Sequence, residues 1–135
     1  MSKVSKQYQW FQFHRAKRDH IVWKKLQEHV AKCLLPKGTL FFVGGTLRYP
    51  KCRAEALMVL KIWRASRTPL SGFHLEQYKR LKKYEVYYPV KGLFFPKYEY
   101  TAGKVARPRR KFSMENITCA SGIHFFFDYN HAKVF

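Results

Sequence analysis

The sequence predicts a small α+β domain with a mostly antiparallel sheet, and three observations lead to this prediction. A chain of 135 residues has room for one modest core. Hydrophobic residues make up 47% of the chain and aromatic residues 18%, which fills such a core and argues against disorder. Strand-like and helix-like segments are separated along the chain, as in α+β folds. We therefore expect one domain over residues 19–135, preceded by an arm over residues 1–18.

The arm interleaves basic and aromatic side chains. A flexible segment that orders on a partner fits this composition, and so does an edge strand, because the residues from Trp10 to Phe13 partly alternate. In either case the arm offers apolar contact to a neighbouring molecule. The residues predicted to contact a partner are Trp10, Phe11, Phe13, Arg15, Lys17 and Arg18.

Residues 20–35 fit two structures. Trp23, Leu26 and Val30 fall at helical spacing, which predicts a helix. The pieces HIVW and HVAKCLL are each typical of strands, however, and the Gln27-Glu28 step between them can turn. After the break at Pro36 and Gly38, residues 39–43 (TLFFV) predict a short buried strand that ends at a glycine pair.

Residues 51–66, KCRAEALMVLKIWRAS, predict the main helix. Ala56, Val59, Leu60 and Trp63 form one apolar stripe at helical spacing, so this helix is expected to be amphipathic. Residues 71–83 predict a second short helix. Residues 84–90 and the segment around Pro96 predict short strands, and residues 104–111 a basic loop.

The end of the chain predicts a strand followed by a helix. GIHFFF, at residues 122–127, has the composition of a buried strand, and Asp128 is a suitable N-cap for a last short helix.

Charge is the extreme feature of the composition. The chain has 27 Lys and Arg residues against 8 Asp and Glu residues, a net charge of +19. Most of these cations have no carboxylate to pair with, so they repel one another until a polyanion approaches. Nucleic acid, bound without sequence specificity, and acidic protein surfaces are therefore the expected partners. The predicted polyanion-binding residues are Lys79, Arg80, Lys82, Lys83, Lys104, Arg107, Arg109, Arg110 and Lys111.

The reactive residues do not form a motif that selects one chemistry. Cys33, Cys52 and Cys119 are odd in number and lack a CxxC pair, which indicates reduced thiols. Cys119, His124 and His131 could form a zinc site with Cys33 or Cys52, but the spacing is unlike that of common zinc modules. Cys119 or Cys52 could act as a nucleophile, but no histidine is paired with either thiol in the sequence. We expect no catalytic residue, metal or cofactor. No apolar run reaches the roughly 18 residues of a membrane span.

Four blocks of the chain carry a resemblance to a known family. They are WKKL, AKCLLPKGT, KCRAEALMVLKI, and YTAGKV followed by CASGIHFFFDYNHA, and they span most of residues 23–135. Together they resemble a domain of unknown function of large DNA viruses, often found beside pentapeptide repeats, which are absent here. The resemblance implies a strand pair early in the chain, which favours a hairpin over a helix for residues 20–35. The resemblance also implies a structural role for five residues of its motifs: Cys52, Arg53, Cys119, Gly122 and His124.

The last block is also similar to the strand-then-helix segment of ADP-ribosyltransferases. That similarity implies an enzyme with a carboxylate at its active site, for which Glu85, Glu99 and Glu115 are the candidates. No flanking motif selects one of them, so a shared shape without activity is the preferred interpretation.

The leading functional hypothesis is a non-enzymatic, basic structural protein of a large DNA virus particle. It would be a minor capsid or genome-associated component, present in the virion and in the host cytoplasm during assembly, and it would assemble with other virion proteins. The alternatives are a free, non-specific DNA- or RNA-binding protein and an ADP-ribosyltransferase-like enzyme.

Overall fold

The computed structural model describes residues 7–64, 85–94 and 98–135. Its strands are β1 (Phe13–Arg15), β2 (His20–Leu26), β3 (His29–Leu35), β4 (Leu40–Gly45), β5 (Pro50–Ala54), β6 (Leu57–Arg64), β7 (Glu85–Val86), β8 (Val90–Lys91), β9 (Glu99–Tyr100), β10 (Val105–Ala106) and β11 (Ile123–Phe125). One short helix, α3 (Tyr129–Val134), follows them. The described part of the chain is therefore mostly antiparallel sheet, as predicted, but with much less helix than an α+β domain implies.

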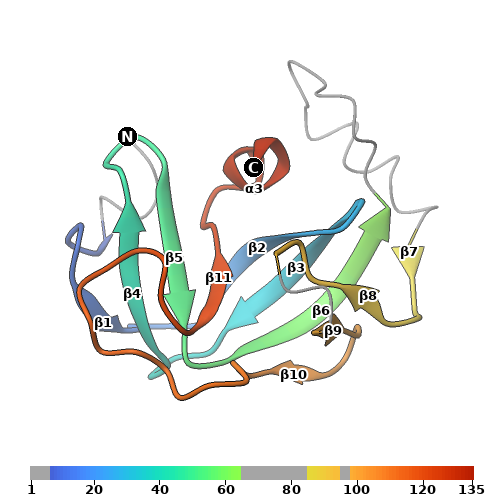
Figure 1. The fold of residues 1–135 in the computed structure, drawn as a ribbon, viewed down its shortest axis with the longest axis horizontal. Coiled ribbons are helices and arrows are strands. Elements are labelled where there is room, and N and C mark those ends of the chain that lie inside the picture. The colour runs from blue at the N-terminus through green and yellow to red at the C-terminus, as the bar shows by residue number, and fades with distance from the viewer. Residues whose placement is uncertain (1–6, 65–84, 95–97) are drawn as a thin grey trace.

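Two sheets form the body of the domain (Figure 1). One has the strand order β1-β4-β5-β11, and the other has the order β10-β6-β3-β2 with β7 also paired to β6. Strands β8 and β9 make a separate pair. The two sheets join at one point, where the backbones of Trp23 and Phe126 exchange hydrogen bonds of 2.8 and 2.7 Å. The strand pairings of the described residues are antiparallel.

The hairpin implied for residues 20–35 is present. Strands β2 and β3 pair along their whole length, from His20 opposite Leu35 to Leu26 opposite His29. Gln27 and Glu28 make the turn, and Glu28 has a φ of 53°. The predicted strands at residues 39–43 and 122–127 correspond to β4 and β11.

The amphipathic helix predicted over residues 51–66 is wrong. Strands β5 and β6 occupy this segment and belong to different sheets. In β6 the pairing with β3 skips Leu60, because Cys33 pairs with Val59 while Lys32 pairs with Lys61. Because of this bulge, the next buried residue after Val59 is Ile62. The two buried residues are three positions apart, which is also the spacing on one face of a helix. The second helix, predicted over residues 71–83, lies outside the described residues.

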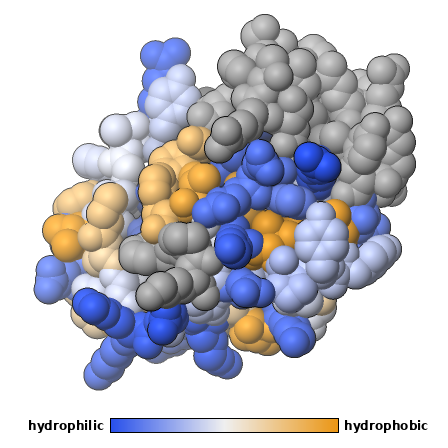
Figure 2. Space-filling model, turned by 45° about the vertical axis from the view of Figure 1, so that its right-hand side comes forward, coloured by the Kyte–Doolittle hydropathy of each residue, from blue (hydrophilic) through white to orange (hydrophobic). Residues whose placement is uncertain are grey.

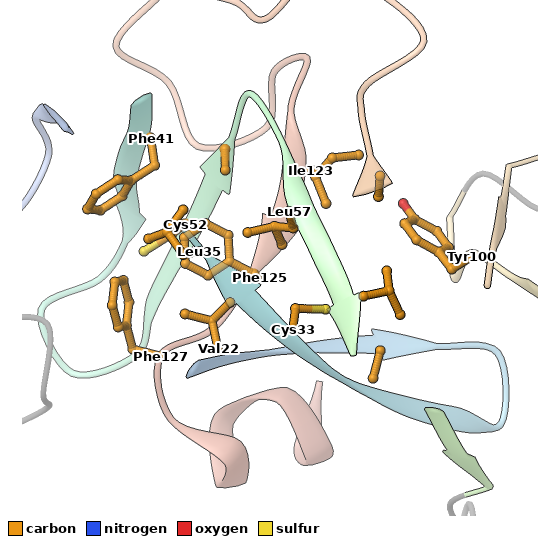
Figure 3. Packing of buried hydrophobic residues seen from close by; sticks show 14 of the residues in the cluster. Val22, Cys33, Leu35, Phe41, Cys52, Leu57, Tyr100, Ile123, Phe125 and Phe127 are labelled. Atoms are coloured by element: carbon orange, nitrogen blue, oxygen red, sulfur yellow. The ribbon is translucent and has the colours of Figure 1, made fainter. Parts of the chain in front are cut away.

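The core lies between the two sheets (Figure 3). Phe41, Phe125 and Phe127 fill one end of it, and Tyr8 packs edge-on against Phe41 at 4.9 Å between ring centroids. The arm is therefore part of the domain from Tyr8 onward, and Phe13–Arg15 forms an edge strand on β4.

Asp128 caps α3 by accepting a hydrogen bond of 2.8 Å from the Asn130 backbone N–H, as predicted. Across the described residues, no helix is long and apolar enough to cross a membrane.

Candidate polyanion-binding surface

The predicted basic loop lines a shallow groove. Arg107, Arg109, Arg110 and Lys111 follow β10 and form one wall of a space of ≈ 410 Å³. All four side chains are exposed. Other residues that line the groove are Leu40, Glu55, Pro108, Phe112 and Met114. Lys104, predicted with this loop, is exposed in the turn before β10, and it is not among the residues that line the groove.

Hydrogen bonds to main-chain atoms of the loop anchor it at both ends. These bonds do not use the basic side chains of the loop. The Tyr98 hydroxyl accepts from the Arg107 N–H at 2.9 Å and donates to the Arg107 carbonyl at 2.5 Å. The Ser121 hydroxyl donates to the Arg110 carbonyl at 2.8 Å. Because these anchors use the main chain, the side chains can point into solvent without loosening the loop.

The groove has little negative charge to offset its cations. Within the described ranges, none of the four basic side chains forms an ion pair with a carboxylate. Glu55 lines the same groove, but its carboxylate accepts a hydrogen bond of 3.0 Å from the Leu40 N–H. Four exposed cations beside one carboxylate leave a positive potential that an anion would relieve.

Arg53 fixes the segment that follows the basic loop. Its side chain is fully buried and donates hydrogen bonds to the carbonyls of Ser113, Glu115, Ile117 and Ser121, at 2.6 to 3.2 Å. The guanidinium also lies over the rings of Phe42 and Phe112, at 4.9 and 5.0 Å. Burial lowers the pKa of Arg53, yet a guanidinium stays protonated in proteins. This arginine of the KCRAEA block therefore binds residues 113–121 onto the outer face of β4 and β5, as the path of the loop in Figure 1 shows.

Gly122 completes this arrangement. A Cβ atom at position 122 would lie 2.9 Å from the Arg53 Cβ and 3.2 Å from two atoms of the Phe112 ring. His124 is the pairing partner of Arg53 in β11, and its ring nitrogen Nε2 lies 3.2 Å from the Thr118 carbonyl. The two resemblance blocks thus meet in space, with Arg53, Gly122 and His124 around one loop.

The arm reaches the same surface through its aromatic residues. The Phe13 ring contacts the groove-lining Phe112 ring edge-on, at 6.0 Å between centroids. Arg15 is exposed and donates to the Gly38 carbonyl at 3.1 Å. Lys17 and Arg18 instead hydrogen-bond to Gln7. Phe13 is therefore the arm residue that contacts the groove, and Trp10 and Phe11 lie exposed just before it in the chain. Lys79, Arg80, Lys82 and Lys83 lie outside the described residues.

Sequence reasoning missed Lys24, which sits at the seam between the sheets. Lys24 lies two residues from each of the buried Val22 and Leu26, so its side chain points to the same inward face of β2. Its ammonium donates to the His124 carbonyl at 2.7 Å and lies 5.3 Å from the Tyr100 ring centroid. Burial lowers the pKa of Lys24 to about 8. The alternation around Lys24 was the available signal, but only once the hairpin was known.

Two of the three thiols lie in the hydrophobic core. Cys33 and Cys52 are buried, and burial raises the pKa of Cys33 to about 12 and that of Cys52 further. A thiol with a raised pKa is a poor nucleophile at neutral pH. Cys119 is exposed. Among the residues that the structure describes, no group of three His, Cys, Asp or Glu side chains could hold a metal ion.

The model of a family of unknown function, DUF5758, matches residues 10–132. The chain belongs to this family. No curated protein and no solved structure matches the chain. The DUF5758 match begins at Trp10, so it includes the arm residues that pack on β4, and it extends through the loop held by Arg53 to α3.

The ADP-ribosyltransferase similarity stays a prediction. Its three candidate carboxylates lie on different elements of the DUF5758 domain: Glu85 in β7, Glu99 in β9 and Glu115 in the loop before β11.

Proposed function

We propose that this DUF5758 domain is a non-enzymatic, basic structural module that binds a polyanion or an acidic protein surface through its charge. The observation that supports this most is the groove beside residues 107–111, where four exposed cations have no carboxylate partner within the described residues. A net charge of +19 extends the same imbalance over the whole chain. Because phosphates contacted by Lys and Arg release bound counterions, such binding is strong at low salt.

The surface is suited to a chain-like anion. Arginine side chains pair bidentately with phosphate or carboxylate groups. In Figure 2, hydrophilic side chains and apolar patches both occur on the visible face of the domain. None of the described residues that line the groove belongs to a helix, which fits binding without sequence specificity.

The binding is tested with the double variant Arg109→Ala/Arg110→Ala. Both side chains are exposed, and the loop anchor at Arg110 uses its backbone carbonyl, so the variant should keep the fold. Duplex DNA affinity is measured by fluorescence anisotropy over a salt series. Each lost phosphate contact makes the log–log slope shallower by about 0.9, so we expect a change of about 1.8.

The matched control is Arg48→Ala/Arg64→Ala, which removes the same charge from two other exposed positions. Equal losses in both double variants would show that net charge alone binds and that the groove has no special role. Salt-independent binding, or none to nucleic acid, acidic proteins or anionic vesicles, would contradict the proposal.

A place in the particle of a large DNA virus is the biological setting that we propose for this module. Its support is the resemblance of the KCRAEA and CASGIHFF blocks. Mass spectrometry of purified particles, with and without their genome, tests it. Presence only with DNA favours genome association, presence in emptied shells favours a minor capsid role, and absence from both leaves a free nucleic-acid-binding protein.

A further inference from the structure

An exposed aromatic pair, Trp10 and Phe11, lies at one end of a row of ring contacts that begins in the basic groove. Phe112 lines the groove and contacts Phe13 at 6.0 Å between ring centroids. Phe13 lies 4.8 Å from Phe42, and Phe42 lies 5.3 Å from Phe11. Trp10 follows at 5.3 Å from Phe11. The row of ring contacts therefore connects Trp10 and Phe11 to the groove, with the fully buried Phe42 as its middle member.

Trp10 and Phe11 remain in contact with water although both are large and apolar. Trp10 is 38% exposed and Phe11 37%. The rings further along the row are more covered, and Phe42 is fully buried. Burial of Trp10 and Phe11 on the protein itself is thus incomplete, which leaves apolar area for a ligand to cover.

The backbone at Phe11 is held in an unfavourable conformation. Its φ of 61° lies in the left-handed region, which bulky side chains rarely adopt. A hydrogen bond of 2.8 Å from the Phe11 N–H to the Val43 carbonyl keeps it there. Residues held in such conformations cluster at ligand-binding sites, because the surrounding structure must offset the strain.

From this geometry we infer that the ligand is a single-stranded nucleic acid, whose bases stack on Trp10 and Phe11 while its phosphates pair with Arg107, Arg109, Arg110 and Lys111. This inference rests on the proposed function and specifies its ligand. Stacking on aromatic side chains needs unpaired bases, which a single strand offers and a duplex keeps inside its stack. Acidic proteins and polyphosphate offer charge without bases. Only the single strand uses both halves of the surface.

The test compares four probes on the intact chain: oligothymidine and oligouridine of about 20 nucleotides, a DNA duplex of about the same length, and inorganic polyphosphate. One base stack corresponds to roughly a tenfold change in affinity. Trp10→Ala should therefore weaken oligothymidine and oligouridine binding about tenfold and change duplex and polyphosphate binding less than about twofold. Trp10→Phe should retain most of the affinity. Tyr87→Ala, at an aromatic that is 75% exposed and does not line the groove, is the matched control.

A second measurement does not depend on the alanine variant folding. Oligothymidine should quench the tryptophan fluorescence of the wild-type chain, and Trp10→Phe should remove that quenching. Stronger binding of oligothymidine or of oligouridine assigns DNA or RNA as the source of the strand. Unchanged quenching in Trp10→Phe, or equal losses of oligothymidine and polyphosphate in Trp10→Ala, would overturn the stacking inference and leave the proposed function standing. If the wild-type chain binds none of these polyanions, both the stacking inference and the proposed function are wrong.

Discussion

The two faces of β4 and β5 pack against very different surroundings. The inner face presents Phe41, Cys52 and Ala54 to the hydrophobic core. The outer face presents Phe42 and Arg53, with a charged guanidinium at the centre of its packing. Period-two alternation along each strand places these residues on opposite sides. This small domain therefore has a hydrophobic core and a second packed region, which is organised by hydrogen bonds from one arginine.

The two regions should differ in how far a disruption spreads. In the core, dispersion and burial act on all strands at once, so the loss of a large ring affects the whole fold. On the outer face, Arg53 acts on the carbonyls of residues 113–121, a segment without regular structure. A change there should release this segment while the sheets remain paired.

The largest effects are expected from one substitution in each region. Phe125→Ala should lower the free energy of unfolding by about 4 kcal/mol, since it leaves a cavity in the core. Arg53→Met should lower it by about 3 kcal/mol, because four carbonyls lose their donor and must regain water. Denaturant unfolding measures both.

Hydrogen exchange separates the two mechanisms. Arg53→Met should speed exchange in residues 113–121 while β2 and β3 stay protected, and Phe125→Ala should speed exchange in both. Arg53→Lys keeps the charge but not the planar fork of donors, so it should rescue little. Uniform loss of protection in Arg53→Met would show that the outer face is not a separate region.

A smaller effect is expected at Gly122, where an added side chain would meet Arg53. Gly122→Ala should destabilise the fold by about 2 kcal/mol, because its Cβ would overlap the Arg53 Cβ and press on the Phe112 ring. Gly103→Ala is the control: it has a φ of 87° and nothing within 4 Å, so its cost of about 1 kcal/mol is backbone strain alone. A harmless Gly122→Ala would mean that the loop can move away from Arg53 freely.

The smallest effect is a pH dependence from His124. Burial, with Lys24 and Lys51 nearby, lowers the pKa of His124 to about 4, from 6.5. As the pH falls from 6.5 toward 4, the unfolded chain takes up a proton that the folded one excludes, so stability falls. We expect a loss on the order of 1 kcal/mol by pH 5, above the range where most carboxylates titrate.

The variant His124→Gln isolates this contribution. The pKa of His20 is also lowered by burial and by Arg18, so the wild type contains a second histidine effect of the same sign. The difference between the unfolding curves of wild type and variant, taken at pH 7 and pH 5, removes that contribution. If the free energy of unfolding falls equally between pH 7 and pH 5 in the wild type and in His124→Gln, the lowered pKa of His124 is contradicted.

Local sequence patterns were sufficient where neighbouring residues determine the structure. Asp128 caps α3 because an N-cap bonds within its own turn, and the hydrophobic run in residues 122–127 contains the core strand β11. The same reasoning failed at residues 51–66, because the bulge at Leu60 exists only through pairing with β3, and it changes the spacing of the buried residues. No window on the sequence contains that partner strand.

The amino-acid sequence by itself determined the charge imbalance, the aromatic content of the core and the short elements that depend on adjacent residues. The tertiary structure decided that Arg53 is buried and that the arm and the basic loop share one surface. Both outcomes depend on contacts between residues far apart in the chain, such as Phe13 with Phe112 and Arg53 with Ser121. Such contacts form only when strands pair and place those side chains on the same face.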